Sequence, residues 1–387
     1  MSDNISEFTF IAIFVFRGVK PLLGGHRALV LDSVEDGFSP KTWPTPEPVP
    51  GSAIVRVTAS VVLSYFREIY NGQRQYPFPT PLVGGCSAIG RITAVGQDAA
   101  ALQLGQLVYV DCVVRARDKP SELFLSTIHE GFSEGSKRLM KDVWHDGTLA
   151  EFVKVPLDNC IPLDEGRLCG SLGYSVLAML YMSYLLVPYS GLQDIKLEPG
   201  ETVAICPATG GYGGAGIQIA ITMGARVISM GRNENELKRL KEHVKKSTPA
   251  ANIKTVKITG DDDTDTLVLQ KFGNIDAVLD ISPPAAAKST HLKSAIRALR
   301  HGGRCSLIGA VEDIMPGLTI TGNNITLKGK FMYEREDMLQ FVKMLGGMFP
   351  IGDNFVSTKV FGLAHWNEAF GEAARYTGIG KMVVLMP

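Results

Sequence analysis

The run PATGGYGGAG, residues 207–216, contains a glycine spacing that could hold a phosphate-bearing cofactor. Gly211, Gly213 and Gly216 form a G-x-G-x-x-G pattern between an apolar segment, TVAIC, and a second apolar run. In a strand-turn-helix context such glycines let backbone amides approach a pyrophosphate at the start of the helix. This pattern predicts a dinucleotide-binding turn. The residues predicted to bind the cofactor here are Thr209, Gly210, Gly211, Tyr212, Gly213, Gly214 and Gly216.

Arg232 could determine which dinucleotide is bound. A site for NAD usually carries Asp or Glu about 20 residues after the first glycine, where it binds the ribose 2′-hydroxyl. Here the segment RVISMG ends at Gly231 and Arg232 follows. A guanidinium can pair with a 2′-phosphate, so the sequence predicts NADPH. Asn233 and Glu236 resemble a capping box, and we therefore interpret the nearby acids as charges of a first helical turn.

The composition narrows the classes of partner. The chain has 387 residues, 45% of them hydrophobic, which predicts two domains. Its 39 basic and 39 acidic residues balance, so there is no charge pattern typical of binding to nucleic acid or to an anionic membrane. Six scattered cysteines without a C-x-x-C pair indicate a reducing compartment, and we expect a cytoplasmic protein with a small-molecule substrate.

Hydrophobic patterning divides the chain into three regions. Between residues 27 and 156, short β-like runs are separated by Pro and Gly turns, which predicts a β-rich domain. From residue 201 strands alternate with helices, which predicts a parallel sheet covered by helices. After residue 329 this alternation stops. A helix near 366–376 and a strand KMVVLM follow, and we expect them to return to the first domain.

Two apolar segments raise the question of a membrane. FTFIAIFVF near the N-terminus is too short to span a bilayer and has acidic rather than basic residues before it, so we treat residues 1–25 as an extension that could add a strand. The run at 172–187 contains Gly, Ser and Tyr. We interpret it as a buried helix that ends before Pro188, and we expect no membrane span.

These features together resemble the medium-chain dehydrogenase/reductase superfamily over residues 26–387, including its fungal alcohol-dehydrogenase-like members. The resemblance implies an α/β fold class, with a doubly wound parallel Rossmann sheet and a GroES-like β-rich catalytic domain. The active site would lie in the cleft between the two domains. The implied division is an extension (1–25), a catalytic domain (26–187), an NADP-binding domain (188–329) and a return to the catalytic domain (330–387).

The resemblance also bears on metal binding. In zinc-dependent relatives the first ligand is a Cys that aligns with Leu63, and a Gly-His-Glu triplet aligns with Gly84-Gly85-Cys86. Leucine and glycine offer no ligand atom, and one thiolate does not make a zinc site. The region that would carry a structural zinc has only Cys112. We therefore expect no metal and interpret Cys86 as a small buried residue.

Zinc-free relatives, the quinone oxidoreductases and enoyl reductases, transfer hydride to the β-carbon of a conjugated carbonyl. A tyrosine in a G-x-Y-P stretch is their suggested proton donor, and GQRQYPFP places Tyr76 there with two extra residues. Tyr65 could serve instead, because a phenol can donate to an enolate without being ionised. Tyr70 lies on the same loop and is a further candidate, and Ser64 could hydrogen-bond a substrate oxygen.

The sequence thus favours a zinc-independent, NADPH-dependent oxidoreductase that reduces an activated C=C bond in a small apolar molecule. Metal-free carbonyl reduction stays open. So does a non-redox role, as an NADPH-binding protein or as an isomerase or cyclase. A homodimer is compatible with the sequence, which does not fix the oligomeric state.

Overall fold

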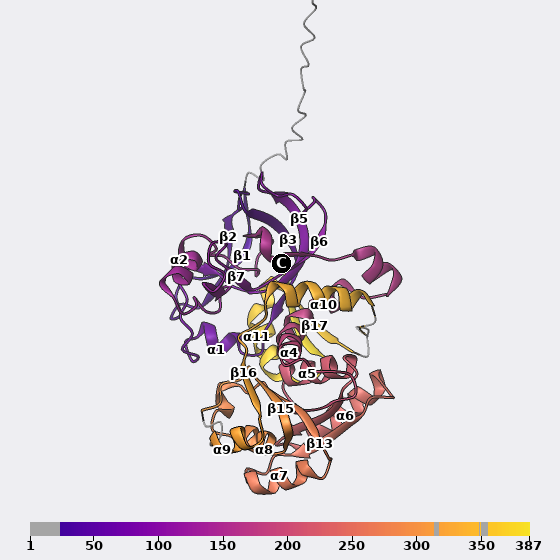
Figure 1. Ribbon diagram of the computed structural model, residues 1–387. Coiled ribbons are helices and arrows are strands. Elements are labelled where there is room, and N and C mark those ends of the chain that lie inside the picture. Colours follow the sequence, from indigo (N-terminus) through magenta and orange to yellow (C-terminus); the bar gives the residue numbers. More distant parts are fainter. Residues whose placement is uncertain (1–23, 313–316, 348, 350–354) are drawn as a thin grey trace, which may run out of the picture.

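The computed structural model describes residues 24–312, 317–347, 349 and 355–387. The predicted N-terminal extension therefore lies almost wholly outside the described residues. Figure 1 shows a β-rich part, drawn in purple, and a second part in orange with helices around a sheet. The yellow C-terminal elements lie between them. We call these parts the substrate domain and the cofactor domain.

The substrate domain is built on two sheets. One has the strand order β2-β1-β4, and the other has the order β10-β6-β5-β3-β18-β17, with β9 also paired to β3. A separate hairpin joins β7 to β8. The strands are β1 (Gly25–Leu31), β2 (Phe38–Pro44), β3 (Ser52–Val62), β4 (Leu82–Val83), β5 (Ala88–Val95), β6 (Leu107–Val110), β7 (Val113–Arg115), β8 (Leu123–Leu125), β9 (Phe152–Pro156), β10 (Cys160–Pro162), β17 (Ser357–Gly362) and β18 (Lys381–Met386). Because β18 pairs with β3, the chain end returns to the first domain as the sequence predicted.

The cofactor domain contains one parallel sheet with the strand order β13-β12-β11-β14-β15-β16. The order reverses between β11 and β14, which is where doubly wound sheets bind their ligands. Its strands are β11 (Thr202–Cys206), β12 (Arg226–Gly231), β13 (Ile253–Lys257), β14 (Ile275–Asp280), β15 (Leu299–Leu307) and β16 (Thr326–Gly329). The predicted Rossmann fold is confirmed.

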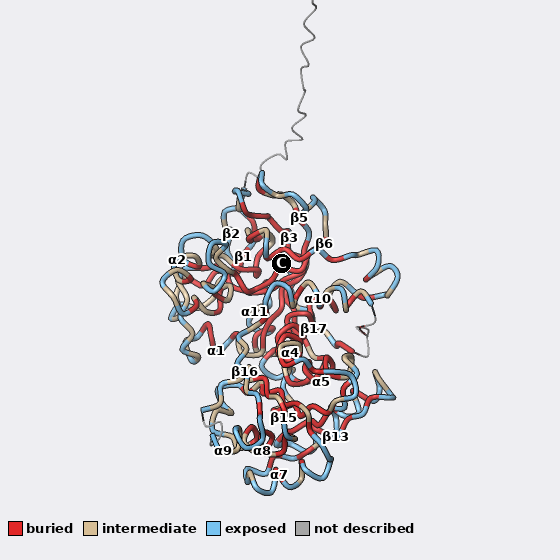
Figure 2. Tube along the Cα trace, in the orientation of Figure 1, coloured by how far each residue is buried: buried red, intermediate tan, exposed pale blue. Residues whose placement is uncertain are grey.

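Alternate residues of the central strand β11 face two different cores. Val203 and Ile205 pack in the core that contains helices α4 and α5, whereas Ala204 and Cys206 pack in a second core with α7 and α8. A strand buried on both faces reads as a continuous apolar run, which is why TVAIC shows no polar alternation. Figure 2 shows the resulting buried strands in the middle of the cofactor domain.

The helices connect and cover these sheets. Helix α6 buries Leu237, Leu240 and Val244 along one face, and Asn233 caps its start by accepting from the amides of Asn235 and Glu236. The α-helices are α1 (Phe66–Tyr70), α2 (Glu134–Asp142), α3 (Val176–Met179), α4 (Met182–Asp194), α5 (Gly211–Thr222), α6 (Glu234–Ser247), α7 (Asp262–Gln270), α8 (His291–Arg297), α9 (Gly317–Gly322), α10 (Arg335–Gly347) and α11 (Trp366–Arg375). Short 3₁₀ turns occur at Leu157–Asn159, Pro284–Ala286 and Leu363–His365, and a π-helical turn at Gly166–Ser171.

The prediction that a helix ends before Pro188 is wrong. Helix α4 continues through Pro188 to Asp194, so the domain boundary predicted at 187/188 falls inside a helix. A proline removes one helical hydrogen bond, but α4 is buried over nearly its whole length and this burial compensates for the loss. Gly216 of α5 packs beside Pro188, where an added Cβ would lie 3.4 Å from the proline Cβ.

Helices α3 and α4 together form the apolar stretch Val176–Asp194. Within the described part of the chain, this is the one helical stretch long and apolar enough to cross a membrane by length and composition. It has 19 residues and a mean hydropathy of 1.2, and 78% of it is buried inside the protein. This burial fits the predicted core helix.

Candidate active site

The glycine-rich turn connects β11 to α5 at the point where the strand order reverses. Helix α5 starts after Gly210 without a side-chain cap, and the amide of Gly214 donates to the Gly210 carbonyl at 2.8 Å. The amides of the first helical turn have no helical partner of their own and can therefore donate to an anion. The turn fits the pyrophosphate of a dinucleotide.

The glycines of this turn are required by close backbone contacts. A Cβ on Gly213 would lie 2.2 Å from the Pro207 carbonyl oxygen, and a Cβ on Gly214 would lie 2.5 Å from the Cα of Ile379. By contrast, a Cβ on Gly210 would meet no atom within 4 Å, so the outer side of the turn is open. The turn is closely packed on the protein side and free where a ligand would approach.

The end of β12 lies next to this turn. The Ala208 amide donates to the Met230 carbonyl at 2.7 Å, and a Cβ on Gly231 would lie 2.9 Å from the Thr209 methyl group. Arg232 follows and is exposed, and none of the ion pairs in the described residues involves it. Its guanidinium is therefore available to a phosphate beside the turn.

The two acids after Arg232 have other partners. Glu236 forms an ion pair with Arg239 at 2.6 Å, and Glu234 lies 3.7 Å from Lys257. Asn233 caps the helix as predicted, although the structure gives no reciprocal bond from Glu236 to the Asn233 amide. Both carboxylates are therefore paired with nearby cations.

Tyr65 from the substrate domain contacts the glycine-rich turn directly. Its hydroxyl lies 3.3 Å from the hydroxyl of Tyr212, so a hydrogen bond joins the two domains at this point. The Tyr212 ring packs on Tyr184 of α4, with 5.1 Å between ring centroids. A phenol is thus held beside the predicted pyrophosphate turn, at the junction between the two domains.

The loop after β3 positions Tyr65 through its buried neighbours. Tyr65 precedes the short helix α1, whose residues Phe66, Ile69 and Tyr70 are buried. The Tyr70 hydroxyl lies 3.0 Å from the Thr127 hydroxyl and accepts from the Gly85 amide at 3.2 Å. These contacts fix the loop to the substrate-domain core, so the direction of Tyr65 is set by tertiary packing.

Arg74 covers the outer side of the Tyr65 ring. Its guanidinium carbon lies 4.4 Å from the Tyr65 ring centroid, and its Nε donates to Glu68 at 2.7 Å. A cation over an aromatic face is attracted by the ring quadrupole. Arg74 therefore restrains the Tyr65 ring at the junction between the domains.

The pKa values of the tyrosines at this junction are raised. Burial raises the pKa of the Tyr65 phenol, although the hydrogen bond with Tyr212 opposes the shift. Burial also raises the pKa of Tyr184 and of Tyr212. These phenols stay protonated at physiological pH and can act as hydrogen-bond donors.

Tyr76 and Ser64 are placed differently from Tyr65. The Tyr76 ring packs against His129, with centroids 5.4 Å apart, and the Arg74 guanidinium lies 6.0 Å from its centroid. Ser64 is half-buried, and its hydroxyl makes no hydrogen bond among the described residues. The structure brings Tyr65 to the glycine-rich turn, whereas the ring contacts that it shows for Tyr76 among the described residues are with His129 and Arg74.

The region aligned with the family's catalytic zinc site lacks suitable donors. Leu63 is buried, and a Cβ on Gly85 would lie 2.7 Å from the Leu149 backbone nitrogen, so even a small side chain would clash there. Cys86 is buried as expected, and burial together with the adjacent Cys112 thiol raises its pKa. The residues present do not fit a zinc ion at this position.

Sequence reasoning missed Tyr184 and Arg74. Tyr184 lies within the apolar run of α4, where a tyrosine is ordinarily a core residue, and Arg74 lies among polar loop residues. Neither belongs to a motif. The one weak signal for Tyr184 was its hydroxyl, which is a polar group within a mostly apolar run.

A β-rich domain joined to a parallel dinucleotide-binding sheet, with a phenol at their junction, defines a nicotinamide-dependent oxidoreductase. Two family descriptions match the chain: "Alcohol dehydrogenase GroES-like domain" over residues 49–165 and "Zinc-binding dehydrogenase" over residues 211–346. The chain belongs to the medium-chain dehydrogenase/reductase superfamily.

Similar proteins agree with this assignment. Alcohol dehydrogenase 2 of Caenorhabditis elegans is 22% identical over 80% of this chain and 84% of its own length. Acryloyl-coenzyme A reductase of Sulfurisphaera tokodaii is 23% identical over 74% of this chain and 77% of its own length. Proteins named alcohol dehydrogenase and proteins named acryloyl-coenzyme A reductase are therefore both similar to this chain.

Solved structures share the fold at low sequence identity. One described as a zinc-binding dehydrogenase of Sinorhizobium meliloti 1021 bound to NADP has a TM-score of 0.71 and 18% identity, and covers 94% of this chain and 99% of that one. An alcohol dehydrogenase of E. coli CFT073 with NADH has a TM-score of 0.73 and 16% identity, and covers 94% of this chain and 100% of that one. The fold therefore occurs with both forms of the cofactor.

Proposed function

We propose that this protein reduces an activated C=C bond, conjugated to a carbonyl, in a small apolar molecule with NADPH as the reductant. The observation that carries the proposal is the Tyr65 hydroxyl beside the glycine-rich turn, in a domain junction where Leu63 and Gly85 occupy positions of the family's zinc ligands. A relative named acryloyl-coenzyme A reductase supports this choice, because the compound in its name is a conjugated thioester.

The roles of the chain's residues follow from their positions. The amides at the start of α5 bind the pyrophosphate, and Arg232 pairs with the 2′-phosphate. When bound, NADPH supplies the hydride that reaches the β-carbon of the substrate. The Tyr65 hydroxyl donates a hydrogen bond to the carbonyl oxygen as negative charge develops there. A proton taken up at the α-carbon completes the reduction.

A neutral phenol suits this role better than an ionised group would. The raised pKa of Tyr65 keeps its proton in place, so the hydroxyl can donate to an enolate oxygen throughout the reaction. Conjugation spreads the developing charge over the substrate, and a hydrogen-bond donor can then replace a Lewis acid. Tyr212 accepts from or donates to Tyr65 and holds its hydroxyl near the cofactor turn.

Isotope transfer tests the proposal most directly. The purified protein would be incubated with NADPH deuterated at the reactive C4 position and a panel of enones, enoyl thioesters, quinones and ketones. We expect deuterium at the β-carbon of a conjugated substrate, located by mass spectrometry and NMR. Deuterium at a carbonyl carbon would instead establish carbonyl reduction, the alternative that the alcohol dehydrogenase relatives favour.

The same experiment addresses a non-redox role. Binding of NADPH without deuterium transfer to any member of the panel would contradict the reductase proposal and favour an NADPH-binding protein or an isomerase. Zinc independence is tested in parallel by assaying the enzyme after prolonged chelation. Loss of turnover that added zinc restores, accompanied by loss of metal, would contradict a metal-free active site.

The cellular setting is part of the proposal. All six cysteines are free, as a reducing compartment requires, and we propose a cytoplasmic enzyme acting on a diffusible small molecule. Because basic and acidic residues balance, we propose that the protein binds neither nucleic acid nor a membrane. We also propose that the protein is a homodimer. Sedimentation or light scattering would measure its mass in solution.

A further inference from the structure

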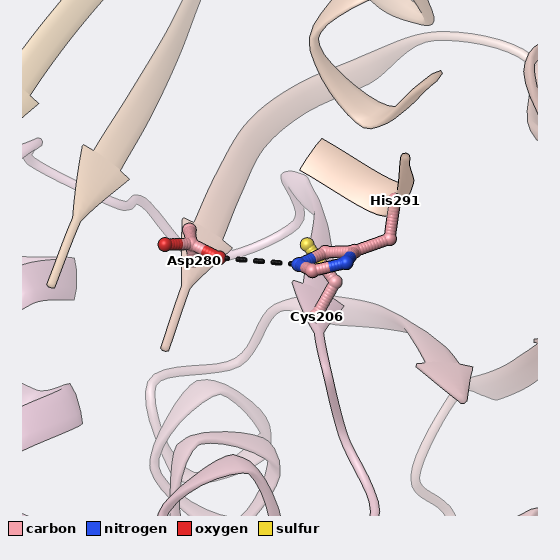
Figure 3. A group of neighbouring side chains, drawn as sticks. All are labelled: Cys206, Asp280 and His291. Carbon is pink, nitrogen blue, oxygen red and sulfur yellow. Dashed lines mark hydrogen bonds and ion pairs between the residues drawn. The ribbon is translucent and has the colours of Figure 1, made fainter. Parts of the chain in front are cut away.

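Three potential metal ligands meet inside the cofactor domain, and the proposed reduction uses none of them. Cys206 ends β11, Asp280 ends the neighbouring strand β14, and His291 begins α8. Cys206 and Asp280 are direct partners in the parallel register. Their ligand atoms and that of His291 all lie within 4.8 Å of one another, and Figure 3 shows the three side chains gathered around one point.

The spacing of these atoms suits a tetrahedral ion. His291 Nε2 lies 3.4 Å from Asp280 Oδ1. Two nitrogen or oxygen ligands about 2.0–2.1 Å from a tetrahedral zinc ion are about 3.3 Å apart. The Ser282 hydroxyl lies 2.8 Å from His291 Nε2 and donates to Asp280 Oδ1 at 2.5 Å, so its oxygen lies closer to both atoms than a fourth tetrahedral ligand would and must move outward when an ion binds. A small displacement of Ser282 would admit the ion between the four groups.

Charge and burial also favour a cation here. Asp280 and Cys206 are fully buried and His291 is 1% exposed. Oδ2 of Asp280 makes no hydrogen bond within the described residues, and His291 is the one basic group paired with this carboxylate there. A buried carboxylate with so few partners is costly, and a divalent cation bound by one carboxylate and one thiolate would be neutral overall.

The surroundings of His291 meet a further requirement of a metal ligand. A histidine that binds a metal through Nε2 usually donates its other ring N–H to a nearby acceptor. Ser289 Oγ lies 2.7 Å from His291 Nδ1 and can accept that hydrogen bond. Binding needs the neutral ring to carry its proton on Nδ1, and the thiol proton of Cys206 leaves to solvent.

We propose that Cys206, Asp280 and His291 form a structural zinc site in the cofactor domain, with Ser282 as the fourth ligand. A set of sulfur, imidazole and carboxylate ligands favours Zn²⁺ over Mg²⁺ or Ca²⁺. The site is separate from Leu63 and Cys86 in the substrate domain, because its ligands come from the ends of β11 and β14 and from the start of α8. Because the ligands are buried, the ion enters as the domain folds.

Cobalt substitution tests this site without an activity assay. The full-length protein would be produced in minimal medium with Co²⁺, then examined by visible and near-ultraviolet absorption and by elemental analysis. We expect about one ion per chain in tetrahedral geometry, with a thiolate-to-cobalt charge-transfer band. Cys206→Ala should abolish that band, and His291→Gln should lower the cobalt content.

Cys86→Ala is the matched control, because Cys86 is also buried but lies in the substrate domain. It should leave the cobalt spectrum unchanged. Absence of a thiolate band in the unmodified protein would overturn the proposal by itself, even if the Cys206 variant failed to fold. A band lost in Cys86→Ala and kept in Cys206→Ala would equally overturn it.

These results are independent of the proposed reduction. Deuterium transfer reports on the junction between the domains, whereas the cobalt spectrum reports on the interior of the cofactor domain. The total zinc content would not show whether an ion is bound in the substrate domain or in the cofactor domain. The comparison of Cys206→Ala with Cys86→Ala does show this.

Discussion

At the scale of single residues, the structure distinguishes between tyrosines that the sequence left as equal candidates. Tyr65 and Tyr76 lie on one loop, and the Arg74 guanidinium lies near both rings. Tyr65 contacts Tyr212 of the glycine-rich turn, whereas Tyr76 packs against His129 of the substrate domain. The tyrosine matched by the G-x-Y-P comparison is therefore not the one that meets the cofactor turn.

Replacing Tyr65 tests its proposed role as a hydrogen-bond donor. We expect Tyr65→Phe to lower kcat for the best conjugated substrate about 100-fold, because removal of one hydrogen-bond donor to a developing oxyanion typically costs a factor of this order. The affinity for NADPH, measured by fluorescence titration, should change little. Tyr76→Phe is the control and should retain most of the activity. A larger loss in Tyr76→Phe than in Tyr65→Phe would reverse the assignment.

Replacing Arg232 tests the choice of cofactor. We expect Arg232→Ala to weaken NADPH binding about 10- to 100-fold, because hydrogen bonds to a charged group contribute about 1.5–3 kcal/mol. NADH binding should be unaffected, since it has no 2′-phosphate. Arg226→Ala is a suitable control, because Arg226 is exposed at the opposite end of β12. Equal losses for NADPH and NADH would exclude a specific contact with the phosphate.

At the scale of elements, the glycines at the start of α5 serve two different purposes: some allow close packing, and others leave space for a ligand. Gly213 must lack a side chain because the Pro207 carbonyl approaches it, whereas Gly210 faces open space. Both appear as glycines in the sequence. The structure separates a glycine needed for packing from one that leaves space for a ligand.

A pair of alanine variants measures this difference. Alanine is normally favoured over glycine in a helix by about 1 kcal/mol, yet we expect Gly213→Ala to destabilise the protein by about 2 kcal/mol or more because of the clash. Gly210→Ala should leave the melting temperature unchanged. Calorimetry or circular dichroism provides the measurement. A stabilised Gly213→Ala protein would show that the Pro207 contact is not restrictive.

At the scale of the whole molecule, a buried hydrogen bond links the two domains. Tyr333 follows the last strand of the cofactor sheet, and its hydroxyl donates to Asp111 of the substrate domain at 2.6 Å. Arg115 adds a hydrogen bond to the Tyr333 carbonyl and lies 3.4 Å from Glu334. The segment that follows the cofactor sheet is therefore held against the substrate domain by hydrogen bonds and an ion pair.

Burial raises the pKa of Asp111 to about 6 from its usual 3.8, although the bond from Tyr333 opposes the shift. The folded state thus binds a proton more tightly than the unfolded state, so stability falls as pH rises from about 4 to about 6. The shift corresponds to about 3 kcal/mol. Above pH 6 the ionised Asp111 lowers the free energy of unfolding by about this amount, relative to its value at low pH.

The pH prediction is tested by comparison with Asp111→Asn. The free energy of unfolding would be measured for both proteins between pH 4 and pH 8. We expect the free energy of unfolding of the Asn variant to rise relative to that of the unmodified protein as pH rises, because Asn cannot ionise. A constant difference across this range would show that Asp111 does not titrate with a raised pKa.

The sequence alone determined the layers of the fold and the position of the cofactor turn. Strands such as TVAIC, RVISMG and KMVVLM coincide with β11, β12 and β18, because burial and backbone geometry impose a local periodicity on the chain. The glycine spacing identified the turn, because the backbone geometry of the turn is also a local property of the chain. These features depend on residues close together in sequence.

The tertiary structure decided what depends on distant residues. The continuation of α4 through Pro188 relies on burial against α5, and no local rule could predict this compensation. The contact of Tyr65 with Tyr212 and the meeting of Cys206 with His291 each join segments far apart along the chain. Such contacts depend on how whole elements pack, because long-range packing, rather than local propensity, places side chains from separate elements together.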